Sequence, residues 1–352
     1  MDPRAYVCAH LERRYLDEHP ELTPAARELV HAEVLSRPAK YAASPHDQAL
    51  LAYMEAHERL MAGLAGMDDL SDEEFDERRA QLFSEARQVL ARIAQGDQLC
   101  VDARLVSILL ADVPLDSALA DLLKLEDEIR GHLTGAVAGF DLNAPGYWDA
   151  ADLARRGITA AERTVSEPAC IGWLHTLEAI ASLCLASARY RAAITYARRA
   201  RAAAGYPNHA EGTVLLALAR LEDEEGFFAF AHELSEDAGD ARTDGLTLDD
   251  SPWYLLARTI LLYKLDKRRA AQRALRTFAE RCDGGAFFIL NPTYLDPYLP
   301  VRPAPQNSWD LAHQAVWEAD GVIADTPDFA TWAEGVDGVL AASEAFAARN
   351  GF

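Results

Sequence analysis

The sequence predicts an all-α protein built from helical hairpins that stack side by side. Three observations lead to this fold class. Half of the 352 residues are hydrophobic, and much of this content is Ala and Leu, which favour helices. Runs that alternate apolar and polar residues with the period of a β-strand are nearly absent. Glycine and proline stand mostly between apolar segments with helical periodicity, so they mark connections.

The helix starts are marked by hydroxyl residues that directly precede a proline. Such a hydroxyl can accept a hydrogen bond from a free N–H group of the first turn, and a proline at the first helical position costs no hydrogen bond. The pairs are Thr23-Pro24, Ser44-Pro45, Ser251-Pro252 and Thr326-Pro327, and Ser71 with Glu74 fits a capping box. We therefore expect helices at about residues 3–17, 24–36, 46–62, 72–95, 98–111, 115–134, 146–164, 168–187, 189–204, 208–223, 226–236, 252–265, 267–281, 308–318 and 328–349.

Most of these helices are joined by short connections, which predicts antiparallel neighbours. Two segments interrupt the pattern. Residues 237–250 are polar and acidic, which predicts an inserted loop. Residues 283–307 are rich in proline and aromatic residues. The apolar character of this second segment predicts that it packs against the helices.

The clearest repeating unit runs from residue 174 to residue 207. Its first helix carries an apolar face with Ala181, and Tyr190 precedes its second helix. Small residues on the second helix, which let two helix backbones approach closely, are Ala193, Ala197 and Ala200, and Pro207 follows the end. A step of 34 residues from these alanines leads to apolar Phe227, Ala231 and Leu234. A third helix pair, residues 253–282, keeps the 34-residue spacing only if residues 237–250 are an insertion.

These features resemble a tetratricopeptide repeat (TPR), a helix pair of about 34 residues. The resemblance is strongest for residues 174–207, extends to the two following helix pairs, and covers roughly the central third of the chain. Leu177 stands where the family usually has a tryptophan. The resemblance implies a TPR-like right-handed solenoid that binds peptides or proteins along a concave face and is not an enzyme.

We expect three regions along the chain. Residues 1–140 form helix pairs without a clear repeat signature. Residues 141–282 form the TPR-like helix pairs. Residues 283–352 comprise the aromatic, proline-rich loop and C-terminal capping helices.

The net charge of -22 argues against some classes of partner. Nucleic-acid backbones and anionic membrane surfaces both require clustered basic residues, so we expect neither as a partner. The five cysteines are scattered without a CxxC pair, which is typical of reduced thiols and predicts a cytoplasmic protein. No signal peptide is evident at the start of the sequence. The most apolar window, residues 169–188, contains His175 and Glu178 and reads as a buried core helix.

Motifs for metal, cofactor or nucleophilic chemistry are absent from the sequence. No HExxH, CxxC pair, Gly-rich phosphate loop or GxSxG occurs. Glu28 and His31 form a single Glu-x-x-His, which we interpret as exposed residues of an amphipathic helix. Cys170 and His175 are five positions apart and point to different sides of a helix, which favours a core cysteine. We therefore predict no catalytic residues, no metal and no cofactor.

Clustered basic residues are the strongest candidates for partner binding. Arg269, Arg273 and Arg276 are spaced i, i+4 and i+7, which places them on one helical face. We predict that an acidic peptide or protein segment, or a C-terminal carboxylate, binds along the concave face at Arg191, Arg198, Lys264, Arg269, Arg273 and Arg276. The sequence does not decide whether these residues form one surface. The alternative is that these side chains are solvated and paired with the protein's own carboxylates.

The aromatic loop supports a second hypothesis. A small-molecule or enzymatic site between the loop and the helices would use Asn291, Tyr294, Tyr298, Arg302 and Trp309. The alternative is that the loop covers the apolar edge of the last helix pair. A third hypothesis is self-association into a homo-oligomer. The sequence does not identify the partner.

Overall fold

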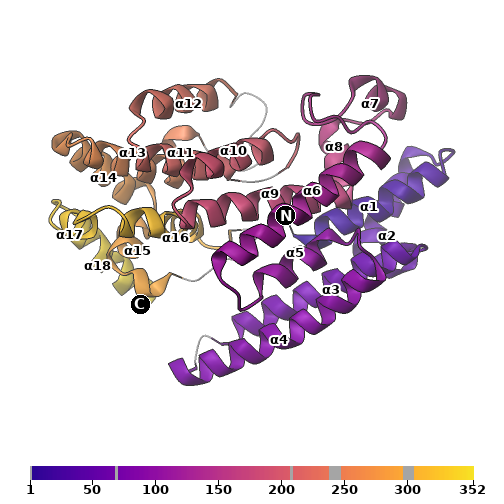
Figure 1. The fold of residues 1–352 in the computed structure, drawn as a ribbon, viewed down its shortest axis with the longest axis horizontal. Helices are drawn as coiled ribbons and strands as arrows, with labels where there is room; N and C mark the ends of the chain where they lie inside the picture. The colour runs from indigo at the N-terminus through magenta and orange to yellow at the C-terminus, as the bar shows by residue number, and fades with distance from the viewer. Residues whose placement is uncertain (1, 68–69, 207–208, 238–246, 296–304) are drawn as a thin grey trace. The chain divides into compact units, whose positions relative to one another are not determined.

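The computed structural model describes the chain except for residues 1, 68–69, 207–208, 238–246 and 296–304 and the side chain of Asp72. The described residues form eighteen α-helices and no β-strand (Figure 1). The predicted all-α class is therefore confirmed. The chain divides into two compact units: unit 1 comprises the residues up to Leu177 with Ala202–Tyr206, and unit 2 comprises most of the remainder from Glu178. The boundary falls within helix α9, whereas the sequence predicts region boundaries at residues 140 and 282.

Unit 1 contains eight helices and the first half of a ninth. The long α3 and α4 pack against each other, α5 packs on α4 and α6, and α1 packs on α2, α3 and α8. Fully buried aromatic rings, including those of Tyr6, Tyr53 and Trp173, fill the core. The elements are α1 (Pro3–Glu18), α2 (Pro24–Ser36), η1 (Pro38–Tyr41), α3 (Pro45–Ala65), α4 (Asp72–Gly96), α5 (Val101–Leu109), α6 (Leu115–Ala136), α7 (Ala150–Arg156), α8 (Ala160–Val165) and α9 (Pro168–Ala186).

Unit 2 contains three successive helical hairpins followed by shorter C-terminal helices. The hairpins are α9–α10, α11–α12 and α13–α14. The elements after α9 are α10 (Tyr190–Arg201), α11 (Ala210–Arg220), α12 (Glu224–Asp237), η2 (Leu248–Asp250), α13 (Pro252–Lys264), α14 (Arg268–Arg281), α15 (Gly285–Leu290), η3 (Pro292–Tyr294), α16 (Asp310–Ala324), α17 (Phe329–Glu334) and α18 (Val339–Asn350).

Most of the predicted helix starts are confirmed. The side chains of Thr23, Ser44 and Ser251 each accept a hydrogen bond from the first turn of the following helix, and the capping box of Ser71 is present. The start predicted at Thr326 is wrong. The Thr326 hydroxyl instead donates to the Val322 carbonyl at 2.7 Å, and the next helix begins after residue 328.

Two of the predicted helices are each divided in the structure. The helix expected at residues 146–164 is divided into α7 and α8, because Gly157 ends α7 in the left-handed conformation with φ 66°. The helix expected at residues 328–349 is divided into α17 and α18, and Gly338 before α18 has φ 87°. The segment 283–307, expected to be irregular, contains the buried helix α15. The expected insertion at residues 237–250 lies largely outside the described residues.

The three hairpins close with the same backbone geometry. Ala188, Glu222 and Asp266 each adopt the left-handed conformation, with φ of 59°, 58° and 55°. In each turn the next residue's N–H donates to a carbonyl five positions back, as in a Schellman motif. The first two turns are 34 positions apart. The second and third are 44 positions apart, which is ten more. The connection that contains residues 237–250 lies between those two turns.

The first helices of the second and third hairpins are enclosed on all sides. Helix α11 packs on α10 and α13, and α13 packs on α14. Gly212 in α11 allows this close approach, since a Cβ there would overlap the indole ring of Trp253. Helix α16 then covers both α11 and α13. The Trp253 Nε1–H donates to Glu318 of α16 at 2.9 Å, and the Tyr263 hydroxyl donates to the Pro327 carbonyl at 3.0 Å.

Candidate functional site

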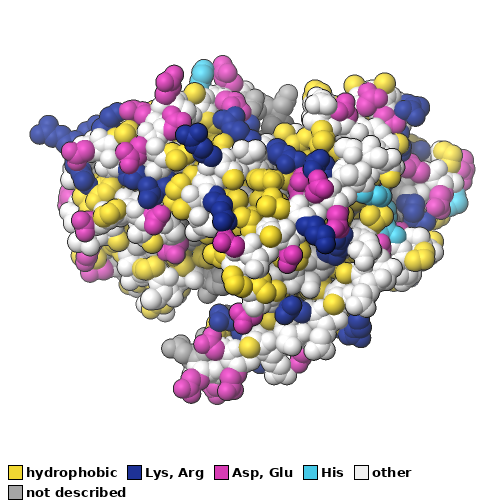
Figure 2. Space-filling view, in the orientation of Figure 1, with side chains coloured by type: hydrophobic (Ala, Val, Ile, Leu, Met, Phe, Trp, Pro, Cys, Tyr) yellow, Lys and Arg dark blue, Asp and Glu magenta, His cyan; other side chains and the backbone are white. Residues whose placement is uncertain are grey.

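Helix α14 separates an apolar face from a strongly basic face. Ala271, Ala274, Leu275 and Phe278 are buried, and α14 packs against α13. This spacing leaves the opposite face to solvent, and the sequence places arginines there. Figure 2 shows Lys and Arg side chains gathered over α14, at the left edge of the view.

Three arginines on this face have no carboxylate partner among the residues that the structure describes. We call Arg269, Arg273 and Arg276 the arginine stripe, because their i, i+4, i+7 spacing aligns them along the helix. All three side chains are exposed, and none forms an ion pair with a described residue. The structure thus places the three residues on one exposed face of α14.

The neighbouring basic residues are different because each has an acidic partner. Lys264 pairs with Glu222 at 3.0 Å, and Lys267 pairs with Glu224. Arg268 bonds to Asp266 at 2.8 Å and lies 3.9 Å above the Tyr263 ring. Lys264, which the sequence predicts as a binding residue, therefore already has a partner on the preceding hairpin.

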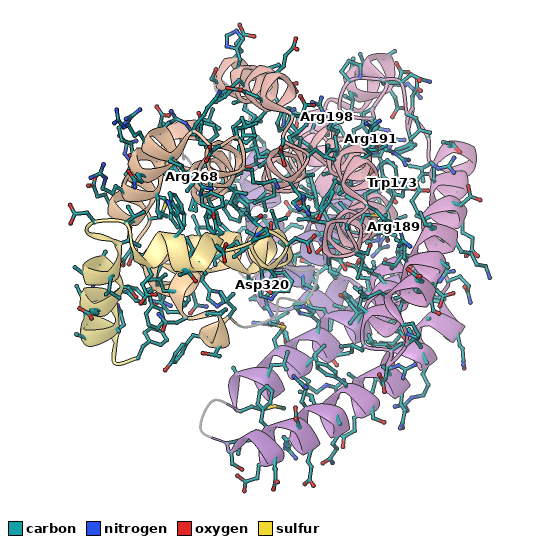
Figure 3. The ribbon with its side chains drawn as sticks, turned by 60° about the vertical axis from the view of Figure 1, so that its left-hand side comes forward. Trp173, Arg189, Arg191, Arg198, Arg268 and Asp320 are labelled. Carbon is teal, nitrogen blue, oxygen red and sulfur yellow. The ribbon has the colours of Figure 1, made fainter. Side chains whose placement is uncertain are left out.

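The structure does not bring the α10 arginines together with the stripe. Figure 3 shows Arg191 and Arg198 on α10 well apart from Arg268, which begins α14. The Arg198 guanidinium lies 4.6 Å above the Phe230 ring and 3.6 Å from Glu233. Arg191 is exposed. The basic residues of α10 and α14 therefore form two separate groups, a point that the sequence left open.

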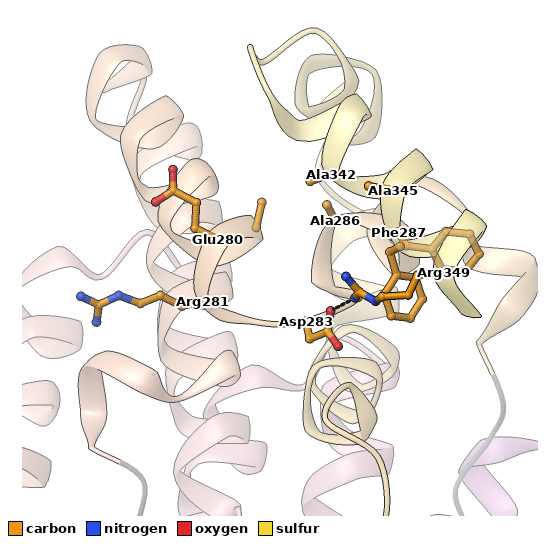
Figure 4. Close-up of a pocket in the computed structure, with 11 residues that line it drawn as sticks. Glu280, Arg281, Asp283, Ala286, Phe287, Ala342, Ala345 and Arg349 are labelled. Atoms are coloured by element: carbon orange, nitrogen blue, oxygen red, sulfur yellow. Dashed lines mark hydrogen bonds and ion pairs between the residues drawn. The ribbon is translucent and has the colours of Figure 1, made fainter. Parts of the chain in front are cut away.

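A cavity of about 290 Å³ lies between the end of α14, α15 and α18 (Figure 4). We call it the C-terminal pocket. Alanines and two phenylalanines make up most of its lining: Ala279, Ala286, Phe287, Ala342, Ala345 and Phe346. Its small residues leave space that a larger apolar group can fill.

Charged side chains surround this apolar lining. Asp283 forms an ion pair with Arg349 at the pocket (Figure 4). Arg281 pairs with Asp250 at 3.4 Å. Glu280 is exposed and forms no ion pair with a described residue. Within the described part of the chain, Glu280 is thus the one acidic residue of the lining without an ion pair, on the side formed by α14.

The predicted loop site is only partly described. Tyr298 and Arg302 lie outside the described residues. The Asn291 amide donates to the Phe287 carbonyl at 2.9 Å, which ends α15. Tyr294 and Trp309 join an aromatic cluster, with ring centroids 5.2 Å from Phe287 and 5.6 Å from Phe288, respectively. The described part of this site is therefore packed with rings. Phe287, which contacts Tyr294, and Phe346, which contacts Trp309, also line the C-terminal pocket.

A buried polar network in unit 1 escaped the sequence analysis. The Asp102 carboxylate lies 3.0 Å from His175 Nδ1 and accepts a 2.7 Å hydrogen bond from the Tyr6 hydroxyl. All three side chains are at most 3% exposed. Burial alone would raise the pKa of Asp102, but the charge of His175 and both hydrogen bonds outweigh burial and lower this pKa. The sequence signal for this network is a single polar residue within each of two apolar segments, at positions 102 and 175.

The described residues hold no group of three or more His, Cys, Asp or Glu side chains arranged for a metal ion. Helix α9 is, among the described residues, long and apolar enough to cross a membrane, but 78% of its apolar window is buried inside the protein, as in a core helix.

No family model, curated protein or solved structure matches the chain.

Proposed function

We propose that this protein is a non-enzymatic, cytoplasmic interaction module. It binds an acidic segment of a partner protein through the arginine stripe on α14. The three hairpins of unit 2 are TPR-like repeats that stack as a short solenoid and present α14 as a rigid helix. The repeated turns at Ala188, Glu222 and Asp266 support this repeat assignment.

The observation that carries the proposal is that the stripe forms no ion pair with any residue that the structure describes. The chain has 56 acidic and 34 basic side chains, so carboxylates are plentiful. Lys264, Lys267 and Arg268 each use one. Arg269, Arg273 and Arg276 use none among the described residues. A guanidinium offers paired N–H donors that match a carboxylate, so three in a row suit a segment with several Asp or Glu residues.

The outer helix α14 is favoured over the first helices of the hairpins. A TPR-like concave face would be lined by helices such as α11 and α13, but α16 covers both. An acidic partner on α11 or α13 would have to displace α16, including the hydrogen bond from Trp253 to Glu318. It would also have to break the hydrogen bond from Tyr263 to the Pro327 carbonyl. The stripe requires no such rearrangement.

The test is a pull-down from native cytoplasm with three baits. They are the wild type, R269E/R273E/R276E, and the control R78E/R87E/R92E, which makes the same charge change at exposed positions of α4. We expect a salt-sensitive partner that the wild type and the control retain and the stripe variant loses. Equal retention by all three folded proteins would contradict the proposal. Light scattering on the same proteins shows whether the partner is a second copy of this chain.

A further inference from the structure

We propose that the C-terminal pocket receives a large apolar side chain from the same acidic segment that binds the arginine stripe. The inference rests on the proposed function and specifies the chemistry of the partner. The segment would carry carboxylates over the stripe and one leucine-sized or phenylalanine-sized residue beyond them.

The stripe leads directly to the pocket. Arg269, Arg273, Arg276 and Glu280 follow one another at i, i+4, i+7 and i+11, so they share a face of α14. Glu280 and its neighbour Ala279 line the pocket. A rise of about 1.5 Å per residue puts Glu280 roughly 16 Å along the helix from Arg269. About five residues of extended chain at 3.3 Å each cover this distance.

The size and lining of the pocket suit a side chain better than a cofactor. Its volume of about 290 Å³ lies just below the usual range of ligand sites, roughly 300–1,000 Å³. Ala342 and Ala345 of α18 leave it open, and Phe287 and Phe346 provide flat apolar walls. Burial of one large apolar side chain changes an affinity by about tenfold or more.

Glu280 selects which part of the segment reaches the pocket. Its unpaired carboxylate would repel an acidic residue there, whereas an apolar residue is tolerated. The α14 surface therefore attracts acidic residues of the segment along the stripe and disfavours them beside Glu280. This order of charges predicts acidic residues first and the apolar residue at the pocket.

The experiment measures fluorescence anisotropy of labelled synthetic peptides. The first probe has five glutamates next to one phenylalanine, and it is made as two peptides, with the phenylalanine at the N-terminal or at the C-terminal end. The second has serine in place of phenylalanine. The proteins are the wild type, R269E/R273E/R276E, A345F to fill the pocket, A342L as a milder filling variant, and A348F as a control at an exposed α18 position outside the pocket.

We expect the wild type and A348F to bind the phenylalanine probe, in one chain direction, about tenfold more tightly than the serine probe. A345F and A342L should lose this preference and keep their affinity for the serine probe. Equal affinity of the wild type for the two probes, with binding still lost in the stripe variant, would overturn the pocket alone. Binding of both probes that is unaffected in the stripe variant would overturn the proposed function, and so would absent binding.

Discussion

Ala188 and Glu222 occupy the same left-handed turn position in two successive hairpins, with φ of 59° and 58°. They lie 34 residues apart, which is the length of the repeat expected from the sequence. A residue with a Cβ pays about 1–2 kcal/mol for this conformation. The two turns thus share their backbone geometry although their side chains differ.

Replacing Ala188 with glycine should therefore stabilise the protein. Relief of strain at the exposed Ala188 exceeds the entropic cost of glycine, so we expect a gain of about 0.5–1 kcal/mol. Ala80→Gly, at an exposed position inside α4, should instead cost about 1 kcal/mol. Urea denaturation of both variants measures this, and a loss at position 188 would contradict the assigned turn.

Removing the Asp102 carboxylate should be strongly destabilising. Asp102→Ala leaves His175 and the Tyr6 hydroxyl buried without this acceptor. Breaking a buried pair of this kind typically costs about 3–5 kcal/mol. Asp112→Ala, at an exposed position, should change stability by less than about 0.5 kcal/mol. Similar denaturation midpoints for the two variants would show that the network contributes little.

Mild acid should weaken the fold through two histidines. Burial lowers the pKa of His10 and of His57 below 6.5. The unfolded chain then binds protons near pH 6 that the folded chain does not, so stability is complete above about pH 6.5 and falls as the pH drops towards the folded pKa values. Urea midpoints between pH 7.5 and 5.5 measure this slope. In the double variant H10Q/H57Q the urea midpoint should depend less on pH. An unchanged dependence would show that other groups cause the loss of stability in acid.

The five cysteines should be unreactive in the folded protein. All are buried, and burial raises the pKa of each thiol, to about 12 for Cys282. The reactive species is the thiolate, so modification by a thiol reagent should be slow before unfolding and complete for all five afterwards. Rapid labelling of native protein would contradict the burial.

Local signals in the sequence predicted the fold class and most helix starts. Thr23, Ser44 and Ser251 cap helices because their hydroxyls need only the next turn as a partner. Thr326 fails because its hydroxyl bonds back to α16. Gly157 and Gly338 each lie inside a segment that the sequence predicts as one helix. In the structure both are left-handed: Gly157 ends α7, and Gly338 precedes α18.

The candidate site depended on contacts that the sequence does not encode locally. The spacing of Arg269, Arg273 and Arg276 predicted one face correctly. Whether a basic residue is free depends on carboxylates of the preceding hairpin, and Lys264 finds Glu222 there. The C-terminal pocket brings α14 together with α18, which lies about sixty residues later. Long-range pairing of this kind is set by packing.

An exchange of charge across the proposed contact tests the central claim most directly. Anisotropy titrations would compare a hexaglutamate and a hexalysine probe against the wild type, R269E/R273E/R276E and R78E/R87E/R92E. We expect the glutamate probe to bind the wild type and the α4 variant, and the lysine probe to prefer the stripe variant over the α4 variant of equal net charge. Identical behaviour of the two variants would contradict the central claim, because net charge alone would then explain the binding.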